Sequence, residues 1–227
     1  QEQLSLLEDA SYNREHLNQE LEASETLLKA RCRDLTRDRK DAALRLKSLL
    51  EAELTELNFK DAKMDVLFQE IPPGEEGADQ VEFLICTNKG EEPKPLAKTA
   101  SGGEISRIML AFKSILGNGD ALPTLIFDEI DSGISGITAS VVGNKLRKLS
   151  REHQILCITH LPQIAAFGDH HYRIIKQDSG ERITTTVEPL DQDGVLSEIA
   201  RLTGGLSITK ATLENARELL ESGRRQE

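Results

Sequence analysis

The chain has 227 residues, and its 28 Lys and Arg residues against 39 Asp and Glu residues give a formal net charge of −11 at pH 7. The acidic balance argues against a free-standing DNA-binding domain, whose surface would be basic overall. No apolar run reaches the roughly eighteen residues of a membrane span, and the polar start of the chain does not resemble a signal peptide. The three cysteines have no metal-ligand spacing and are expected to be reduced thiols. We therefore expect a cytoplasmic protein with one globular domain and an appendage.

Residues 1–57 are predicted to form one long helix. Neither Gly nor Pro occurs from Gln1 to Ile71, and both residues break helix interiors. A helix folded against the domain is the alternative, but the charged faces are too broad for burial. We therefore interpret this segment as one arm of a coiled coil. One seam position recurs every seven residues, at Leu21, Leu28, Leu35, Ala42 and Leu49.

The arm also carries a basic stretch, which has two interpretations. It could contact DNA, or it could be a solvated face whose cations pair with nearby acidic residues along the helix. The second interpretation is favoured because acidic residues lie at helix-pairing distances throughout the stretch. The basic residues are Arg31, Arg33, Arg37, Arg39 and Lys40.

Residues 58–227 are predicted to form an α/β lobe. Strands alternate with helices, which is typical of an α/β core, and the runs at 124–127 and 154–159 indicate buried parallel strands. The tail is predicted as two short helices split at Gly204 and Gly205. The expected strands are 64–68, 81–87, 124–127, 154–159, 172–176 and 183–187, with the first two forming a hairpin, and the expected helices are 104–116, 137–151 and the two within 194–222.

The apolar run at 124–127 ends in two adjacent carboxylates, Asp128 and Glu129. Open α/β sheets bind ligands at the carboxyl ends of their strands. One carboxylate of such a pair can hold Mg²⁺, and the other can polarise a water molecule beside a phosphate. An exposed acidic pair without function is the alternative for this motif alone.

Two further motifs lie where they could contact a nucleotide. Ser101 and Glu104 have the spacing of a capping box at the start of a helix, and Gly102 and Gly103 would let a phosphate approach bare backbone N–H groups there. His160 follows the strand at 154–159 as Asp128 follows the strand before it. A lone histidine is usually structural, but at this position it could contact the γ-phosphate of a nucleotide.

In this order, the motifs resemble those of the ABC ATPase superfamily. Residues 100–104 resemble its signature motif, residues 124–129 its Walker B strand with the catalytic glutamate, residues 132–135 its D-loop, and His160 its switch histidine. The glutamate after the signature glycines and the preceding arm resemble the chromosome-maintenance and repair branch. The block from 93 to 163 closely resembles the SMC-like DNA repair ATPases of bacteria.

The resemblance implies a fold, a reaction and partners. The fold would be the C-terminal lobe of an ABC ATPase head, with a mostly parallel sheet, flanking helices and a long coiled-coil helix in front. The cofactors would be ATP and Mg²⁺, and heads would pair as homodimers around ATP to move the arms on DNA during double-strand break repair at the bacterial nucleoid. The implied roles are metal binding for Asp128, catalysis for Glu129 and His160, and nucleotide contacts for Ser101, Gly102, Gly103, Glu104, Ser132 and Gly133.

Two other functions stay open beside this one. The chain could be a coiled-coil scaffold whose nucleotide site has decayed, or another SMC-type chromosome-maintenance ATPase. Intact Ser101, Asp128, Glu129 and His160 argue against decay.

The sequence departs from the superfamily pattern at two points. Ser135 stands where many ABC proteins have the D-loop aspartate, and no G-x-x-x-x-G-K-[ST] phosphate loop occurs. The single Lys-Thr pair, Lys98–Thr99, follows prolines where the loop's backbone donors should be. In the family the phosphate loop lies in an N-terminal lobe. We therefore expect this chain to be a C-terminal portion, inactive by itself, whose partner is that N-terminal lobe.

Overall fold

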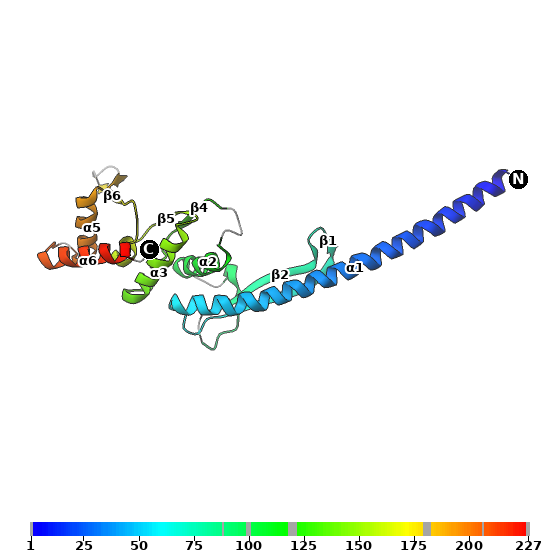
Figure 1. Ribbon diagram of the computed structural model, residues 1–227, viewed down its shortest axis with the longest axis horizontal. Coiled ribbons are helices and arrows are strands. Elements are labelled where there is room, and N and C mark those ends of the chain that lie inside the picture. The colour runs from blue at the N-terminus through cyan, green and yellow to red at the C-terminus, as the bar shows by residue number, and fades with distance from the viewer. Residues whose placement is uncertain are drawn as a thin grey trace. The chain divides into compact units, whose positions relative to one another are not determined.

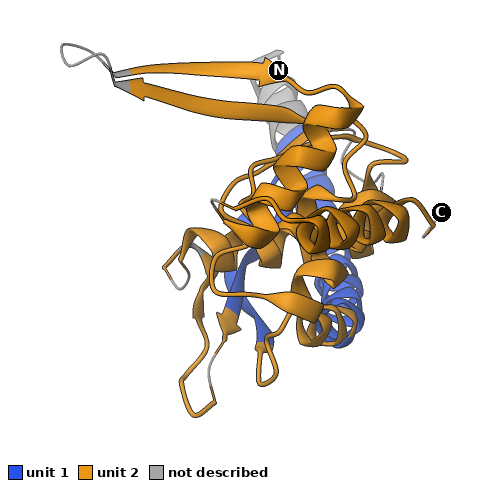
Figure 2. Cartoon of the chain, turned by 90° about the vertical axis from the view of Figure 1, so that its left-hand side faces the viewer, with its two compact units in different colours: residues 1–48, 64–84 blue, residues 49–63, 85–227 orange. Residues whose placement is uncertain are grey.

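The computed structural model describes residues 2–87, 89–98, 101–117, 122–178, 183–205 and 207–225, with the backbone alone for 2–11, 97, 178 and 183. The chain divides into two compact units, shown in Figure 2. The first comprises residues 1–48 and 64–84, and the second comprises residues 49–63 and 85–227.

The first long element is the helix α1, Glu2–Glu56, which confirms the predicted long N-terminal helix (Figure 1). After it, β1 (Lys63–Gly74) and β2 (Gly77–Cys86) are neighbours in a three-stranded sheet whose order is β1-β2-β3, with β3 at Lys94–Pro95. The predicted hairpin is therefore present. Its first strand is longer than the predicted 64–68 and includes Pro72 and Pro73.

Within the first unit, α1 packs its side at Cys32, Thr36 and Arg39 against the β1–β2 hairpin. Thr36 Oγ1 donates to the Asp79 carboxylate at 2.7 and 2.8 Å, and Arg39 Nη1 lies 3.4 Å from the same carboxylate. Cys32 is 8% exposed and the Asp79 side chain is 6% exposed. The spacing of 4 and 3 residues keeps these positions on one helix face.

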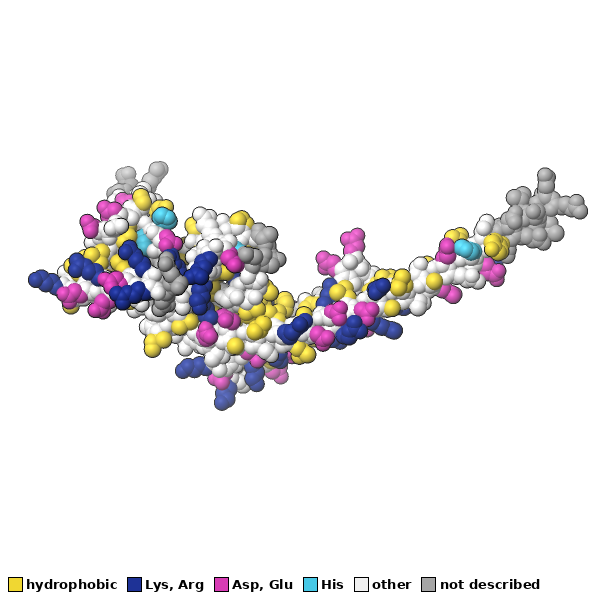
Figure 3. Space-filling model, viewed as in Figure 1, with side chains coloured by type: hydrophobic (Ala, Val, Ile, Leu, Met, Phe, Trp, Pro, Cys, Tyr) yellow, Lys and Arg dark blue, Asp and Glu magenta, His cyan; other side chains and the backbone are white. Residues whose placement is uncertain are grey.

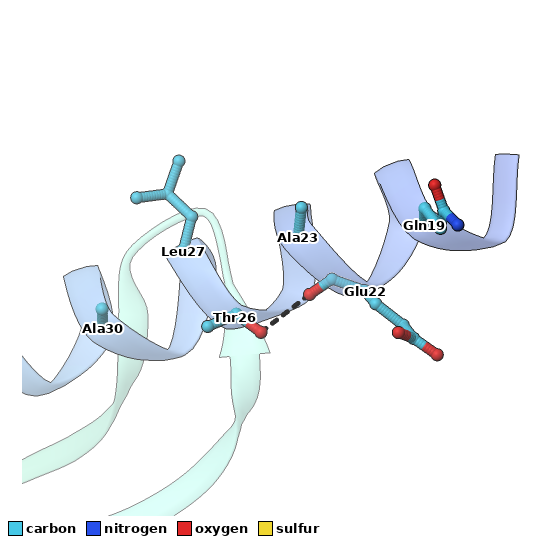
Figure 4. Close-up of a pocket in the computed structure, with 6 residues that line it drawn as sticks. All are labelled: Gln19, Glu22, Ala23, Thr26, Leu27 and Ala30. Carbon is cyan, nitrogen blue, oxygen red and sulfur yellow. Dashed lines mark hydrogen bonds between the residues drawn. The ribbon is translucent and has the colours of Figure 1, made fainter. Parts of the chain in front are cut away.

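The predicted coiled-coil seam lies on exposed parts of α1. Leu21, Leu28 and Leu49 are 58%, 48% and 54% exposed, and Figure 3 shows charged side chains interspersed with hydrophobic ones along the helix. A shallow hollow in the same helix is lined by α1 residues alone (Figure 4). The seam is therefore accessible to a second helix, and the coiled-coil arm stays a prediction. The hollow is lined by Gln19, Glu22, Ala23, Thr26, Leu27 and Ala30.

The second unit contains the α/β lobe, which confirms the predicted fold class. From α2 its helices and strands alternate up to α4, and a separate hairpin and two helices follow. The elements are η1 (Leu96–Lys98), α2 (Gly102–Leu116), β4 (Thr124–Phe127), α3 (Gly136–Leu149), β5 (Gln154–Cys157), α4 (Pro162–Ala165), β6 (Tyr172–Asp178), β7 (Ile183–Pro189), α5 (Gln192–Gly204) and α6 (Lys210–Arg225).

Two apolar clusters hold this lobe together. Ile108 on α2 and Val142 on α3 are fully buried, and these two helices pack against each other. Ile199 on α5 and Ala216 on α6 form a second cluster, which Ala165 of α4 joins. Burying each large aliphatic side chain contributes about 1.5–3 kcal/mol. The first set of contacts joins α2 to α3, and the second joins α4, α5 and α6.

The strands β4 and β5 pair in parallel, as predicted, with Ile126 opposite Leu156 and Phe127 opposite Cys157. The expectation that these strands are buried on both faces is wrong for the chain as it stands. Ile126 is 70% exposed and Leu156 47% exposed. Alternate residues of a strand point to opposite faces, so one face of the pair is uncovered. The remaining pair, β6 and β7, is antiparallel and separate, so the parallel sheet comprises two strands in the described residues. Across the described chain, no helix is long and apolar enough to span a membrane.

Within the second unit, Lys145 of α3 joins the end of α1 by two ion pairs. Its Nζ lies 2.6 Å from Glu53 Oε2 and 2.7 Å from Glu56 Oε2, and the Lys145 side chain is 11% exposed. Burial alone would lower the pKa of Lys145, but hydrogen bonds to both carboxylates raise it above its ordinary value. The hydrogen bond from Lys145 lowers the pKa of Glu56.

Lys145→Met should lower the free energy of unfolding by about 1–3 kcal/mol, because the half-buried Glu53 loses a charged hydrogen-bond donor. The folded-state pKa of Glu56 lies below its ordinary value of 4.5, so its contribution is complete above pH 4.5 and is lost as the pH falls through the lower folded value. The difference between parent and variant should therefore narrow below pH 4.5. Urea unfolding across that pH range measures both effects.

The matched control is Lys29→Met, which removes an exposed i,i+4 pair with Glu25 on α1. Such pairs contribute no more than about 0.5 kcal/mol. A Lys145 variant as stable as this control would show that the junction between α1 and α3 does not depend on the ion pairs.

Candidate functional site

The ends of β4 and β5 bring the sequence motifs to one edge. Because the strands are parallel neighbours, their carboxyl ends lie at the same edge of the pair. Asp128 and Glu129 follow β4, and His160 follows β5 after a further backbone bond from Ile158 N to Phe127 O at 3.0 Å. The predicted parallel placement of the acidic pair and the histidine is therefore present.

The helix α2 begins at this same edge with the predicted capping box. Ser101 Oγ accepts from the backbone N–H of Glu104 at 3.4 Å, and Glu104 Oε2 accepts from the backbone N–H of Ser101 at 3.2 Å. Both interactions satisfy N–H groups that a helix start leaves without partners. Ala100, the first residue of the motif, lies outside the described residues.

The two glycines of α2 pack closely against the turn after β4. A Cβ at Gly103 would lie 2.6 Å from both the carbonyl oxygen of Glu129 and Cβ of Ser132, and one at Gly102 would lie 2.7 Å from Glu129 Oε2. Glu129 itself has φ +55, an uncommon conformation for a residue with a side chain. The glycines therefore have a packing role within this chain, and the Glu129 carboxylate lies beside the N-terminus of α2, where negative charge is favoured.

Arg107 of α2 also bonds to the turn that follows β4. Its guanidinium donates to the carbonyls of Ile130 at 3.2 Å and Ser132 at 2.6 Å, and it lies 5.1 Å from the ring centre of Phe59. Arg107 is 5% exposed, and burial lowers its pKa, against the opposing effect of nearby carboxylates. Sequence reasoning gave this residue no role, although a cation in the middle of an apolar helix was a usable signal.

Ser106 adds a second link between α2 and β4. Its hydroxyl donates to the carbonyl oxygen of Asp128 at 2.7 Å. The carboxylate of Asp128 is on an exposed residue. Together with Arg107, this bond fixes the backbone on both sides of Glu129.

Asp131 connects the turn after β4 to the residues after β5. It is 4% exposed, and its Oδ2 accepts from Thr159 Oγ1 at 2.5 Å and from the backbone N–H of His160 at 2.7 Å. Nδ1 of His160 lies 2.9 Å from the same oxygen. The sequence pattern assigns no role to Asp131 or Thr159, because their contacts join residues 28 and 29 positions apart in the chain.

Exposed residues of the predicted D-loop, Ser132, Gly133 and Ser135, lie just before α3. Gly133 has φ +74, a conformation that favours glycine. Ser135 precedes α3, and its side chain makes no capping hydrogen bond to that helix. Ser132 and Gly133 are both exposed. Their side of the turn is therefore open to a partner.

Cys157 lies at the end of β5 among acidic neighbours. Burial raises the pKa of its thiol to about 12, and the charges of Asp131 and Asp128 act in the same direction. The thiol is therefore protonated at neutral pH and a poor nucleophile. It does not belong to the catalytic candidates.

The donor set suits a weakly held divalent cation. Among the described residues, no cluster of three or more His, Cys, Asp or Glu side chains is placed to hold a metal. Mg²⁺ usually keeps several waters and binds one or two carboxylates together with substrate phosphates. The exposed carboxylate of Asp128 fits that requirement.

The basic stretch of α1 forms pairs within the first unit. Arg37 Nη1 lies 3.2 Å from Asp34 Oδ1, and Arg39 pairs with Asp79 of the β1–β2 hairpin and donates to the carbonyl of Glu76 at 2.7 Å. Arg37 therefore pairs along the helix as interpreted, whereas Arg39 pairs with the hairpin instead.

The fold is an α/β lobe that follows a long helix in the chain, and the order of its motifs resembles that of SMC-like ABC-type ATPase heads. Solved SMC head structures align with the chain at low similarity. The head with coiled coil and joint from Pyrococcus yayanosii has a TM-score of 0.48 and 19% identity, covering 83% of this chain and 32% of that one. The head from Pyrococcus furiosus has a TM-score of 0.48 and 20% identity, covering 82% and 39%.

Curated sequences define the family more narrowly. The chain is 43% identical over 210 residues to the DNA repair protein RecN of Halalkalibacterium halodurans, 40% over 221 residues to that of Haemophilus influenzae and 36% over 237 residues to that of Bacillus subtilis. These matches cover 90%, 96% and 97% of the chain but 37%, 40% and 41% of the relatives. No family model matches. The chain belongs to the RecN family and spans about two fifths of the length of these relatives.

Proposed function

We propose that this chain forms part of an ATP-hydrolysing head that acts in recombinational repair of DNA double-strand breaks. Three motifs distant in sequence meet at one edge of the β4–β5 pair, and this convergence is the main support. Gly102 and Gly103 pack on Glu129 and Ser132, and Asp131 joins this turn to His160. The relatives are DNA repair proteins by name.

Each residue has a distinct role in this proposal. Asp128 holds Mg²⁺, which supplies charge neutralisation on the phosphates when bound. Glu129 orients and polarises the attacking water, and His160 contacts the γ-phosphate. Phosphoryl transfer needs little covalent help from the protein, so positioning and charge stabilisation are sufficient.

The N-terminus of α2 faces nucleotide held by a second head. Its backbone N–H groups and dipole favour an anion, and the hydroxyl of Ser101 adds a donor. The exposed Ser132 and Gly133 lie on the adjoining turn and complete this contact surface. The assembly is then a homodimer of heads, with Glu104 retaining its capping role in α2.

The missing phosphate loop is supplied by the N-terminal lobe of the same protein. Residues 1–57 form the returning coiled-coil arm and residues 58–227 the C-terminal lobe. The uncovered apolar face of the β4–β5 pair supports this arrangement, because Ile126, Leu156 and Ile158 are 70%, 47% and 49% exposed. ATP-driven pairing of heads would move the arms on DNA, in the bacterial cytoplasm at the nucleoid.

Calorimetric titration of Mg-ATP tests this assignment with the chain alone and with the N-terminal portion of a RecN protein added. The chain alone should neither bind nor hydrolyse ATP, because phosphates need a nest of backbone N–H groups and a lysine. The assembled head should do both. Micromolar binding and phosphate release by the chain alone would contradict the division into lobes. An assembled head that never binds ATP would favour the scaffold function.

A further inference from the structure

A buried carboxylate contacts an exposed histidine ring. The Asp131 side chain is 4% exposed, and that of His160 is 73% exposed. A single oxygen, Oδ2, accepts from Thr159 Oγ1 and from the backbone N–H of His160. His160 is therefore held at its backbone while its ring remains accessible.

The distance from His160 Nδ1 to Asp131 Oδ2 fixes the position of a ring proton. The two atoms are 2.9 Å apart. A carboxylate oxygen and an unprotonated ring nitrogen both carry lone pairs, which repel at this separation, so the contact favours hydrogen on Nδ1. The group bonded to one ring nitrogen commonly sets the state of the other. Nε2 is then the nitrogen left for a ligand.

We infer that Asp131 is the positioning residue for His160: it fixes the backbone, the ring orientation and the Nδ1–H tautomer, so that Nε2 is presented to the nucleotide. This inference rests on the proposed function for the role of His160. Asp131 itself acts through the ring.

The turn that carries Asp131 is held rigidly enough for this role. Arg107 donates to the carbonyls of Ile130 and Ser132, the residues on either side of Asp131. The carboxylate therefore connects the turn bearing Ser132 and Gly133 with the histidine after β5. A shift of that turn would move the ring with it.

Nitrogen NMR of the chain with isotope-labelled histidine tests the tautomer directly. Spectra are recorded near pH 9, well above the ordinary histidine pKa of about 6.5. His160→Gln identifies the His160 signal among the five histidines. The parent should show Nδ1–H at His160, and Asp131→Ala should shift the ring towards Nε2–H. Asp131→Asn keeps a neutral acceptor and should restore part of the parental signal.

Thr159→Val is the matched control, because it removes the hydroxyl that donates to the same Asp131 oxygen and accepts from the N–H of Leu161, and leaves the ring contact. Its His160 signal should match the parent. A parent ring in the Nε2–H form overturns the inference without any variant, and so does an Nδ1–H signal that persists in Asp131→Ala.

Turnover in the assembled head separates this inference from the proposed function. Asp131→Ala should lower kcat by about 10²-fold, as expected when a proton-bearing group is misplaced, with the KM for ATP little changed and no further loss when His160→Gln is added. Unchanged turnover in Asp131→Ala would contradict the positioning role. A parent head without ATPase activity but with the Nδ1–H tautomer would contradict the proposed function alone.

Discussion

Glu129→Gln in an assembled head should still bind ATP but hydrolyse it about 10²–10⁴ times more slowly, the usual cost of removing a positioned general base. The amide keeps the size of the side chain but cannot polarise water as a carboxylate does. Glu129 lies at the turn after β4, with its backbone fixed by Ser106 and Arg107 on either side. Phosphate release under single-turnover conditions measures the chemical step.

Glu214→Gln is the matched control, because it makes the same chemical change on an exposed residue of α6. It should turn over ATP at the parental rate. Near-normal hydrolysis by Glu129→Gln would remove Glu129 from the catalytic role, and Asp128 would then be the remaining carboxylate to test.

Ser101→Arg should abolish ATP-dependent pairing of heads while the ATP affinity of a single head stays nearly unchanged. The bulky cation would occupy the N-terminus of α2, where the nucleotide of a second head is proposed to bind. The substitution also removes the helix cap seen in the structure, which costs about 1 kcal/mol. Light scattering with Mg-ATP measures pairing. Ser101→Arg is compared with Ser101 in heads that also carry Glu129→Gln, so that slow turnover does not separate the pairs.

Ser101→Ala separates bulk from capping, because it loses the same side-chain acceptor without adding volume. It should pair, although more weakly than the parent. Equal loss of pairing in both variants would assign the effect to the helix cap. A collapse of ATP binding in single Ser101→Arg heads would show that the signature motif works within its own head.

Local features of this chain were predictable from sequence. The capping box of Ser101 and Glu104 involves residues three apart, so spacing alone indicates it. The parallel pairing of β4 with β5 follows from apolar runs separated by a helix. The positions of Asp128 and His160 at neighbouring strand ends followed from the same pattern.

Tertiary contacts were not predictable in the same way. The link from Asp131 to His160 spans 29 residues in sequence, and nothing in either local pattern indicates it. On α1, heptad spacing selected the leucines, whereas the helix bonds to β2 and to the turn before it through Thr36 and Arg39. Hydropathy also reports whether a strand is apolar, but it does not report whether another element covers it, as Ile126 demonstrates.

The open β4–β5 pair has a practical consequence for handling the protein. Two short parallel strands separated by a helix form late, because a long loop must close before they gain contacts. Each strand also has a free edge in the described residues, and unpaired edges beside apolar side chains recruit other chains. Self-association that increases with protein concentration is therefore expected when the chain is produced alone, and production together with the covering lobe should suppress it from the start of synthesis.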